Sequence, residues 1–158
     1  MTSAGDGSTP SFSPDGRQLV ITLGGVDGNP DIYVLDINSR RKTRLTTHRA
    51  IDTEPVWTQD GRSIIFTSDR SGSPQLYQIN VEGGRAKRLT FEGNYNSAAS
   101  LSPDGKYIAF LRQRQAEEDC YYETKFPALE STYRTRKCSR QNSRHPALDT
   151  YLPPQRDS

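Results

Sequence analysis

The chain has 158 residues, of which 32% are hydrophobic and 25% charged, and its formal net charge at pH 7 is +2. This balance predicts no nucleic-acid-binding surface, because such a surface needs a concentration of basic residues. No apolar run is long enough to cross a bilayer, and the first ten residues lack the basic and apolar segments of a signal peptide. We therefore expect no membrane insertion, and a cytoplasmic location if the chain is expressed as written.

Residues 1–9 are small and polar, and we expect them to be disordered. A short phrase then occurs three times, as PSFSPDG at residues 10–16, PVWTQDG at 55–61 and ASLSPDG at 99–105. Its final glycines lie 45 and 44 residues apart, a period typical of β-propeller blades. The Asp-Gly pair that ends each copy favours a tight turn between two strands.

Strand-like segments follow each turn in the same order. The first unit continues with LVITL, DIYVLDI and KTRLT, the second with SIIFT, QLYQIN and KRLT, and the third with KYIAFL only. These runs are too short for helices and rich in β-branched residues, so they predict strands. A four-stranded sheet with apolar residues on both faces cannot bury itself and must stack against its neighbours.

The predicted fold is therefore all-β: an incomplete β-propeller of four-stranded antiparallel blades. Two full blades span about residues 10–54 and 55–98, and part of a third spans 99–111. Packing between blades is expected from equivalent residues of the first strand (Phe12, Trp57, Leu101), the second (Val20, Ile65, Ile108) and the third (Tyr33, Tyr77). A propeller needs about four to eight blades, so blades were lost, or the chain pairs with another, or it remains an open stack.

The tail, residues 112–158, carries neither a DIYVLD-like strand nor a closing RLT element. Two interpretations remain open: a disordered tail, or a segment that is not native to the fold because the reading frame was truncated or shifted. A helix at 116–125 is a further alternative. Cys120 and Cys138 have no neighbouring histidine pair, which argues against zinc and leaves a disulfide or two thiols.

The phrases SPDG, DIYVLD and RLT, with TEPVW, SDRSGSPQLYQIN, GGRAKRLTFEGNYN and SLSPDGKYIAF, resemble the C-terminal propeller of the TolB family over about residues 10–111. TolB proteins are periplasmic members of the Tol–Pal envelope system and combine an N-terminal α/β domain with a six-bladed propeller. The resemblance implies a fragment of such a protein, acting in the periplasm as a non-enzymatic scaffold that binds other proteins.

The same resemblance implies the partners. They are the peptidoglycan-associated lipoprotein Pal and bacteriocin segments that use the propeller channel during import, whereas the segment that contacts TolA is absent. The implied roles are outer-membrane integrity and constriction during cell division. No cofactor and no metal are implied.

Loops that lead into the innermost strands of a propeller line one end of its channel, where extended partner segments bind. In this chain those loops are HRAIDTE at 48–54 and EGNYNSA at 92–98. Their charged, hydroxyl, amide and aromatic groups can contact a partner. The predicted partner-binding residues are His48, Arg49, Asp52, Thr53, Glu54, Tyr95 and Asn96. The alternative is that these are solvated loops whose polar groups cap turns.

No nucleophile elbow, P-loop or zinc-protease motif occurs, so the sequence indicates no enzyme. Asp15, Asp60 and Asp104 recur, but each stands in a turn where aspartate is favoured for its geometry. A second hypothesis is the propeller portion of a prolyl-oligopeptidase-like peptidase or related hydrolase without its catalytic domain. The sequence around Trp57 and at 91–96 fits the TolB family more closely, which favours the scaffold.

Overall fold

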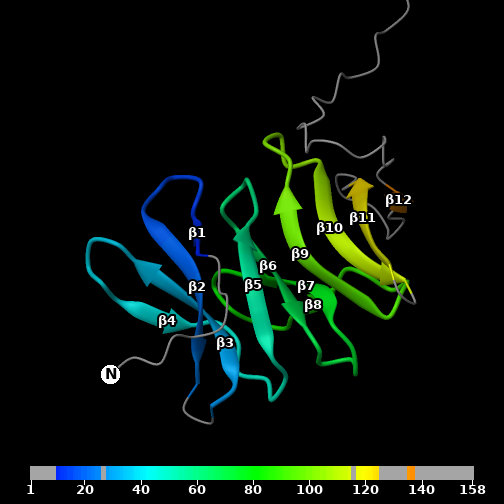
Figure 1. Cartoon of the computed structure of the whole chain (residues 1–158). Coiled ribbons are helices and arrows are strands. Elements are labelled where there is room, and N and C mark those ends of the chain that lie inside the picture. The colour runs from blue at the N-terminus through cyan, green and yellow to red at the C-terminus, as the bar shows by residue number, and fades with distance from the viewer. Residues whose placement is uncertain (1–9, 26–27, 115–116, 125–134, 138–158) are drawn as a thin grey trace, which may run out of the picture.

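A computed structural model describes residues 10–25, 28–114, 117–124 and 135–137. The described residues form strands and no helix, and the strands make three four-stranded antiparallel sheets that stand side by side (Figure 1). This confirms the predicted all-β fold, an incomplete propeller of antiparallel four-stranded blades.

In each sheet the strands are neighbours in chain order. The first sheet contains β1 (Ser11–Phe12), β2 (Gln18–Gly24), β3 (Pro30–Asp36) and β4 (Lys42–Arg44). The second contains β5 (Asp52–Trp57), β6 (Ser63–Ser68), β7 (Gln75–Asn80) and β8 (Lys87–Arg88). The third contains β9 (Tyr95–Leu101), β10 (Tyr107–Arg114), β11 (Glu117–Thr124) and β12 (Thr135–Lys137).

The third sheet differs from the expectation that the repeat stops at Leu111. Strand β11 pairs with β10 along its whole length, and β12 pairs with β11. Strand β11 therefore occupies most of residues 116–125, the segment for which a helix was one of the alternatives. Strands pair through hydrogen bonds between backbone groups, so a strand that lacks the DIYVLD pattern can still pair with β10. The remainder of 112–158 lies outside the described residues.

Each sheet has a leading face, turned toward the preceding sheet, and a trailing face, turned toward the next. Successive residues of a strand point to opposite faces, so Ile64 belongs to the leading face and Ile65 to the trailing face of the second sheet. The core between the first two sheets combines trailing residues Val20, Ile32, Val34 and Leu45 with leading residues Trp57, Ile64, Phe66, Tyr77 and Ile79. The next core combines Ile65, Leu76 and Leu89 with Ala99, Ile108 and Phe110.

Most residues predicted to pack between blades are buried there, but Phe12 and the half-buried Tyr33 are not, and Ile108 was aligned with the wrong equivalents. Phe12 and Tyr33 lie on the leading face of the first sheet, which no sheet of the described residues covers, and Phe12 is 64% exposed, whereas its equivalent Trp57 is only 5% exposed. Ile108 is buried but lies on a leading face, opposite to Val20 and Ile65. Its alignment with them was off by one residue, and one residue reverses the face of a strand.

Phe66 tests the core between the first two sheets, because its side chain is completely buried there. We expect Phe66→Ala to lower the free energy of unfolding by about 3–5 kcal/mol. Phe91→Ala is the matched control, since Phe91 is 69% exposed and should change stability by less than about 0.5 kcal/mol. Urea denaturation followed by circular dichroism measures both, and equal effects would contradict the assigned core.

The Asp-Gly turns share one hydrogen-bond pattern. The hydroxyls of Ser13, Thr58 and Ser102 each donate to the aspartate two residues later, at 2.6 Å. The same carboxylates accept a backbone N–H from the second residue beyond, at 3.1 Å. The turn geometry thus uses the aspartates as acceptors, as the sequence indicated. The hydroxyl bond of Ser13 and the backbone bond of Arg17 lower the pKa of Asp15, and those of Ser102 and Lys106 lower that of Asp104.

These lowered pKa values predict a loss of stability in acid. A carboxylate whose folded-state pKa is below the ordinary value of about 3.8 stabilises the fold above that pH, and the contribution is lost as pH falls through the folded-state pKa. We expect Asp104→Asn to flatten the decline of unfolding free energy below about pH 4. Glu82→Gln, which removes an exposed carboxylate elsewhere, controls for the change in net charge. Parallel pH profiles for wild type and Asp104→Asn would disprove this role.

Candidate functional site

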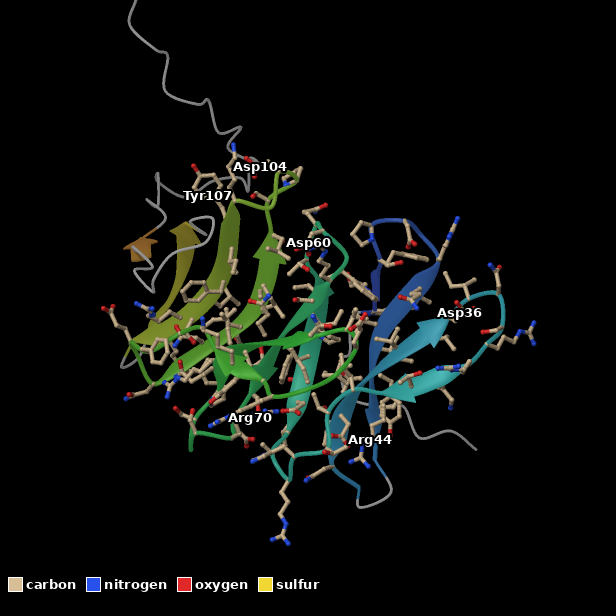
Figure 2. All side chains as sticks on the ribbon, turned by 180° about the vertical axis from the view of Figure 1, so that it is seen from behind. Asp36, Arg44, Asp60, Arg70, Asp104 and Tyr107 are labelled. Carbon is tan, nitrogen blue, oxygen red and sulfur yellow. The ribbon has the colours of Figure 1, made fainter. Side chains whose placement is uncertain are left out.

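The two ends of the sheet stack carry different groups. Figure 2 shows Asp60 and Asp104, from the Asp-Gly turns, at one end and Arg44 and Arg70 at the opposite end. We call the latter the inner-loop end, because there the loops 47–51 and 91–94 lead into β5 and β9. The loop between β2 and β3 also lies there, and the Asn29 side-chain amide donates to the Arg49 carbonyl oxygen.

The strands begin earlier than the sequence indicated. Since β5 starts at Asp52 and β9 at Tyr95, part of each expected loop is strand. Of the seven predicted residues, only His48 and Arg49 remain in a loop, and both are exposed. The Nδ1 atom of His48 accepts the Ala50 N–H at 3.0 Å, which shapes this loop.

Asp52 is completely buried and is held by Arg70 from the loop after β6. The Arg70 guanidinium donates to both carboxylate oxygens, at 2.9 and 2.8 Å. The guanidinium carbon also lies 4.9 Å from the centre of the Tyr77 ring and 5.2 Å from that of Phe66. Asp52 therefore ties the start of β5 to the rest of its own blade, and its side chain is enclosed by the protein.

Asn96 stands at the equivalent position of β9 and is also completely buried. Its amide nitrogen donates to Gln75 Oε1 and to the Glu92 carbonyl, both at 2.8 Å, while its oxygen accepts from Arg112 Nε at 2.8 Å. Since Gln75 belongs to the second sheet, Asn96 links neighbouring blades. Gly93 lets Arg112 approach, because a Cβ there would lie 3.0 Å from Arg112 Cδ.

Glu54 makes a second link between blades. One of its carboxylate oxygens accepts from Thr67 Oγ1 at 2.7 Å and from the backbone N–H of Ala98 at 2.8 Å. Glu54 and Ala98 both have positive φ, 52° and 53°, at equivalent places where the strand register shifts. Such bulges redirect a side chain, here the Glu54 carboxylate toward β9. The neighbouring Thr53 is half-buried and pairs with Thr67 in the ladder.

The surface of the inner-loop end consists of residues between these buried links. Tyr95 is exposed, as are Ile51 at the equivalent position of the preceding blade and Phe91. Phe91 packs against Arg88, whose guanidinium carbon is 5.3 Å from the ring centre. The sequence prediction missed Ile51, Phe91 and Arg70. The equivalence of Ile51 with Tyr95 could have revealed Ile51, whereas the Arg70 contact depends on a fold-specific approach of two loops.

The described part of the chain contains no cluster of three or more His, Cys, Asp or Glu residues that could hold a metal ion. Within the same residues, no helix has the length and apolarity needed to cross a membrane. The inner-loop end presents exposed aromatic, aliphatic and charged side chains, among them Tyr95, Ile51 and Arg49.

Three stacked four-stranded sheets with equivalent loops at one end define a β-propeller protein. A profile described as the TolB beta propeller domain matches residues 2–132, which is most of the chain. The chain belongs to the TolB β-propeller family. The match also includes β11, beyond the point where the sequence repeat ended.

Individual relatives agree. The chain is 37% identical over 70 residues to the Tol-Pal system protein TolB of Helicobacter pylori, a match that covers 44% of this chain and 16% of the relative. The crystal structure of TolB from Acinetobacter baumannii is similar with a TM-score of 0.68 and 42% identity, covering 74% of this chain and 29% of that one. A putative TolB from Agrobacterium tumefaciens gives 0.68 and 25%, covering 75% and 47%. The chain thus spans a minor part of these proteins.

Asp52 and Arg70 give a direct test of the buried link. Removing one partner of a buried ion pair leaves an uncompensated charge, so we expect Asp52→Ala to lower the free energy of unfolding by about 3–5 kcal/mol. Glu82→Ala is the control, because it removes an exposed carboxylate and should change the free energy of unfolding by less than about 0.5 kcal/mol. If the Asp52→Ala and Arg70→Ala effects simply add in the double variant, the two side chains do not act as a pair.

Proposed function

We propose that the chain is a non-enzymatic protein-binding module of the Tol–Pal system, acting in the periplasm, and that Pal is its partner. The family assignment supports this proposal, because relatives are named as Tol-Pal system proteins. The proposed cellular roles are outer-membrane integrity and cell division, with bacteriocin segments as further ligands. The chain is proposed to be a fragment of a longer propeller protein.

The observation that carries the proposal is the construction of the inner-loop end. Its scaffold is fixed by buried polar links through Asp52 and Asn96, so the exposed groups between them are held in place before a partner arrives. Tyr95, Ile51 and Arg49 supply aromatic, aliphatic and cationic contacts. Aromatic and arginine side chains of this kind contribute much of the energy in protein interfaces.

Within this proposal the seven predicted residues divide into two groups. His48, Arg49 and Tyr95 are exposed and are proposed to touch the partner directly. Asp52, Thr53, Glu54 and Asn96 are buried or half-buried and are proposed to hold the loops in shape.

Binding of purified Pal to the folded chain, measured by isothermal titration calorimetry, tests the proposal. We expect Tyr95→Ala and Arg49→Ala each to weaken binding about tenfold, the loss typical of a contact worth 1.4 kcal/mol. Arg62→Ala is the matched control for Arg49, because Arg62 is equally an exposed arginine but lies in an Asp-Gly turn at the other end. It should leave the affinity within about twofold.

The absence of Pal binding by a chain whose circular dichroism shows folded sheets would reject the proposed partner. Equal losses for Arg49→Ala and Arg62→Ala would instead reject the inner-loop end as the binding surface.

A further inference from the structure

Arg44 of the first sheet and Arg88 of the second stand at equivalent positions, each just before a buried Leu-Thr pair. The Nε atom of each guanidinium donates to the carbonyl oxygen of that threonine. Arg44 also forms an ion pair with the carboxylate of Asp31, which is completely buried. The equivalent of Asp31 in the second sheet is Gln75, a neutral amide whose Oε1 accepts from Thr90 Oγ1. The second sheet therefore keeps the arginine but lacks the carboxylate that balances it.

The guanidinium of Arg88 is oriented by contacts that leave its charge uncompensated. The Nε bond to Thr90 holds one edge, and the guanidinium carbon lies 5.3 Å from the centre of the Phe91 ring. In the described part of the chain, no aspartate or glutamate forms an ion pair with Arg88, and its two terminal nitrogens donate to no other group. The carboxylate of the following loop, that of Glu92, points to Arg112 instead. The terminal nitrogens of Arg88 are therefore available to an anion.

Phe91 places an apolar ring beside this charge. It is exposed, and it stands where the first sheet has Thr47. Arginine and aromatic side chains are both enriched at protein interfaces. An arginine that is already stacked on a ring loses less conformational freedom when it binds a ligand. The second sheet stands between the other two in Figure 1, so the sheets beside this pair are described on both sides.

We propose that Arg88 and Phe91 form a docking site for an acidic segment of a partner protein. A glutamate or aspartate carboxylate of the partner pairs with the terminal nitrogens of Arg88, and an adjacent apolar side chain packs on Phe91. The planar guanidinium matches a carboxylate through two parallel hydrogen bonds. The complex thereby restores the arginine–carboxylate pair that Arg44 makes with Asp31 inside the first sheet. This inference rests on the proposed protein-binding function, to which it adds the chemistry of the partner.

Selection from a random-peptide phage library on the immobilised 158-residue chain tests this chemistry without assuming a partner. We expect the wild-type chain to enrich peptides with Asp or Glu next to an apolar residue, and Arg88→Glu to abolish that enrichment. Arg62→Glu is the matched control, because it reverses the charge of an exposed arginine at the opposite end and should keep the enrichment. Failure of the wild-type chain to enrich acidic peptides, or an enrichment that survives Arg88→Glu, would overturn the proposal.

A double-mutant cycle distinguishes direct contact from a structural role of Arg88. Fluorescence anisotropy measures the affinity of a selected peptide, and of its analogue with the acidic residue replaced by the amide, for the wild-type chain and for Arg88→Gln. We expect each single change to weaken binding about tenfold, and the two together to weaken it little further. Losses that simply add would show that Arg88 does not meet this carboxylate.

The same variants separate this site from the choice of Pal as partner. A chain that enriches acidic peptides through Arg88 but does not bind Pal would reject Pal and support the site. A chain that binds Pal with no loss on Arg88→Gln, and enriches no acidic peptide, would reject the site and support Pal.

Discussion

Packing of one sheet face on the next is the constraint on which the rest of the structure depends. Each sheet is apolar on both sides, so every blade needs a neighbour on each side to remove its side chains from water. A buried Ile64 or Phe66 contributes about 1.5–3 kcal/mol by leaving water. This stabilisation belongs to pairs of blades and not to any one blade. The stability of the described sheets is therefore coupled.

The polar links at the inner-loop end follow from the same packing. The packed faces of neighbouring sheets extend to the first residues of β5 and β9. The polar side chains there are enclosed, so they need hydrogen-bond partners inside the protein. Asp52 finds Arg70, while Asn96 finds Gln75 and Arg112. The outer edges face water instead. There β4 and β8 are short and carry Lys42 and Lys87, which disfavour pairing with a foreign strand.

The sequence repeat was sufficient to predict the sheets, the turns and most of the buried residues, because the blade period and strand patterns are local. It was insufficient where the outcome depends on a neighbour. Phe12 has the chemistry of Trp57, but no sheet in the described part of the chain covers it, and β11 forms by backbone pairing without the repeated side chains. In the candidate site, the sequence placed Asp52 in an exposed loop. Its burial could not be predicted, because its partner Arg70 lies on another loop that only the fold brings near.

Comparison of equivalent positions explains how one scaffold can present a specific surface. At the buried position, Asp52 and Asn96 differ little, and each accepts a hydrogen bond from an arginine. At the exposed position just before it, Ile51 and Tyr95 differ in size and polarity. The buried residues are restricted by the need for partners, whereas exposed residues are free to vary between blades. Repetition thus fixes where each side chain stands, and variation among blades makes the inner-loop end asymmetric.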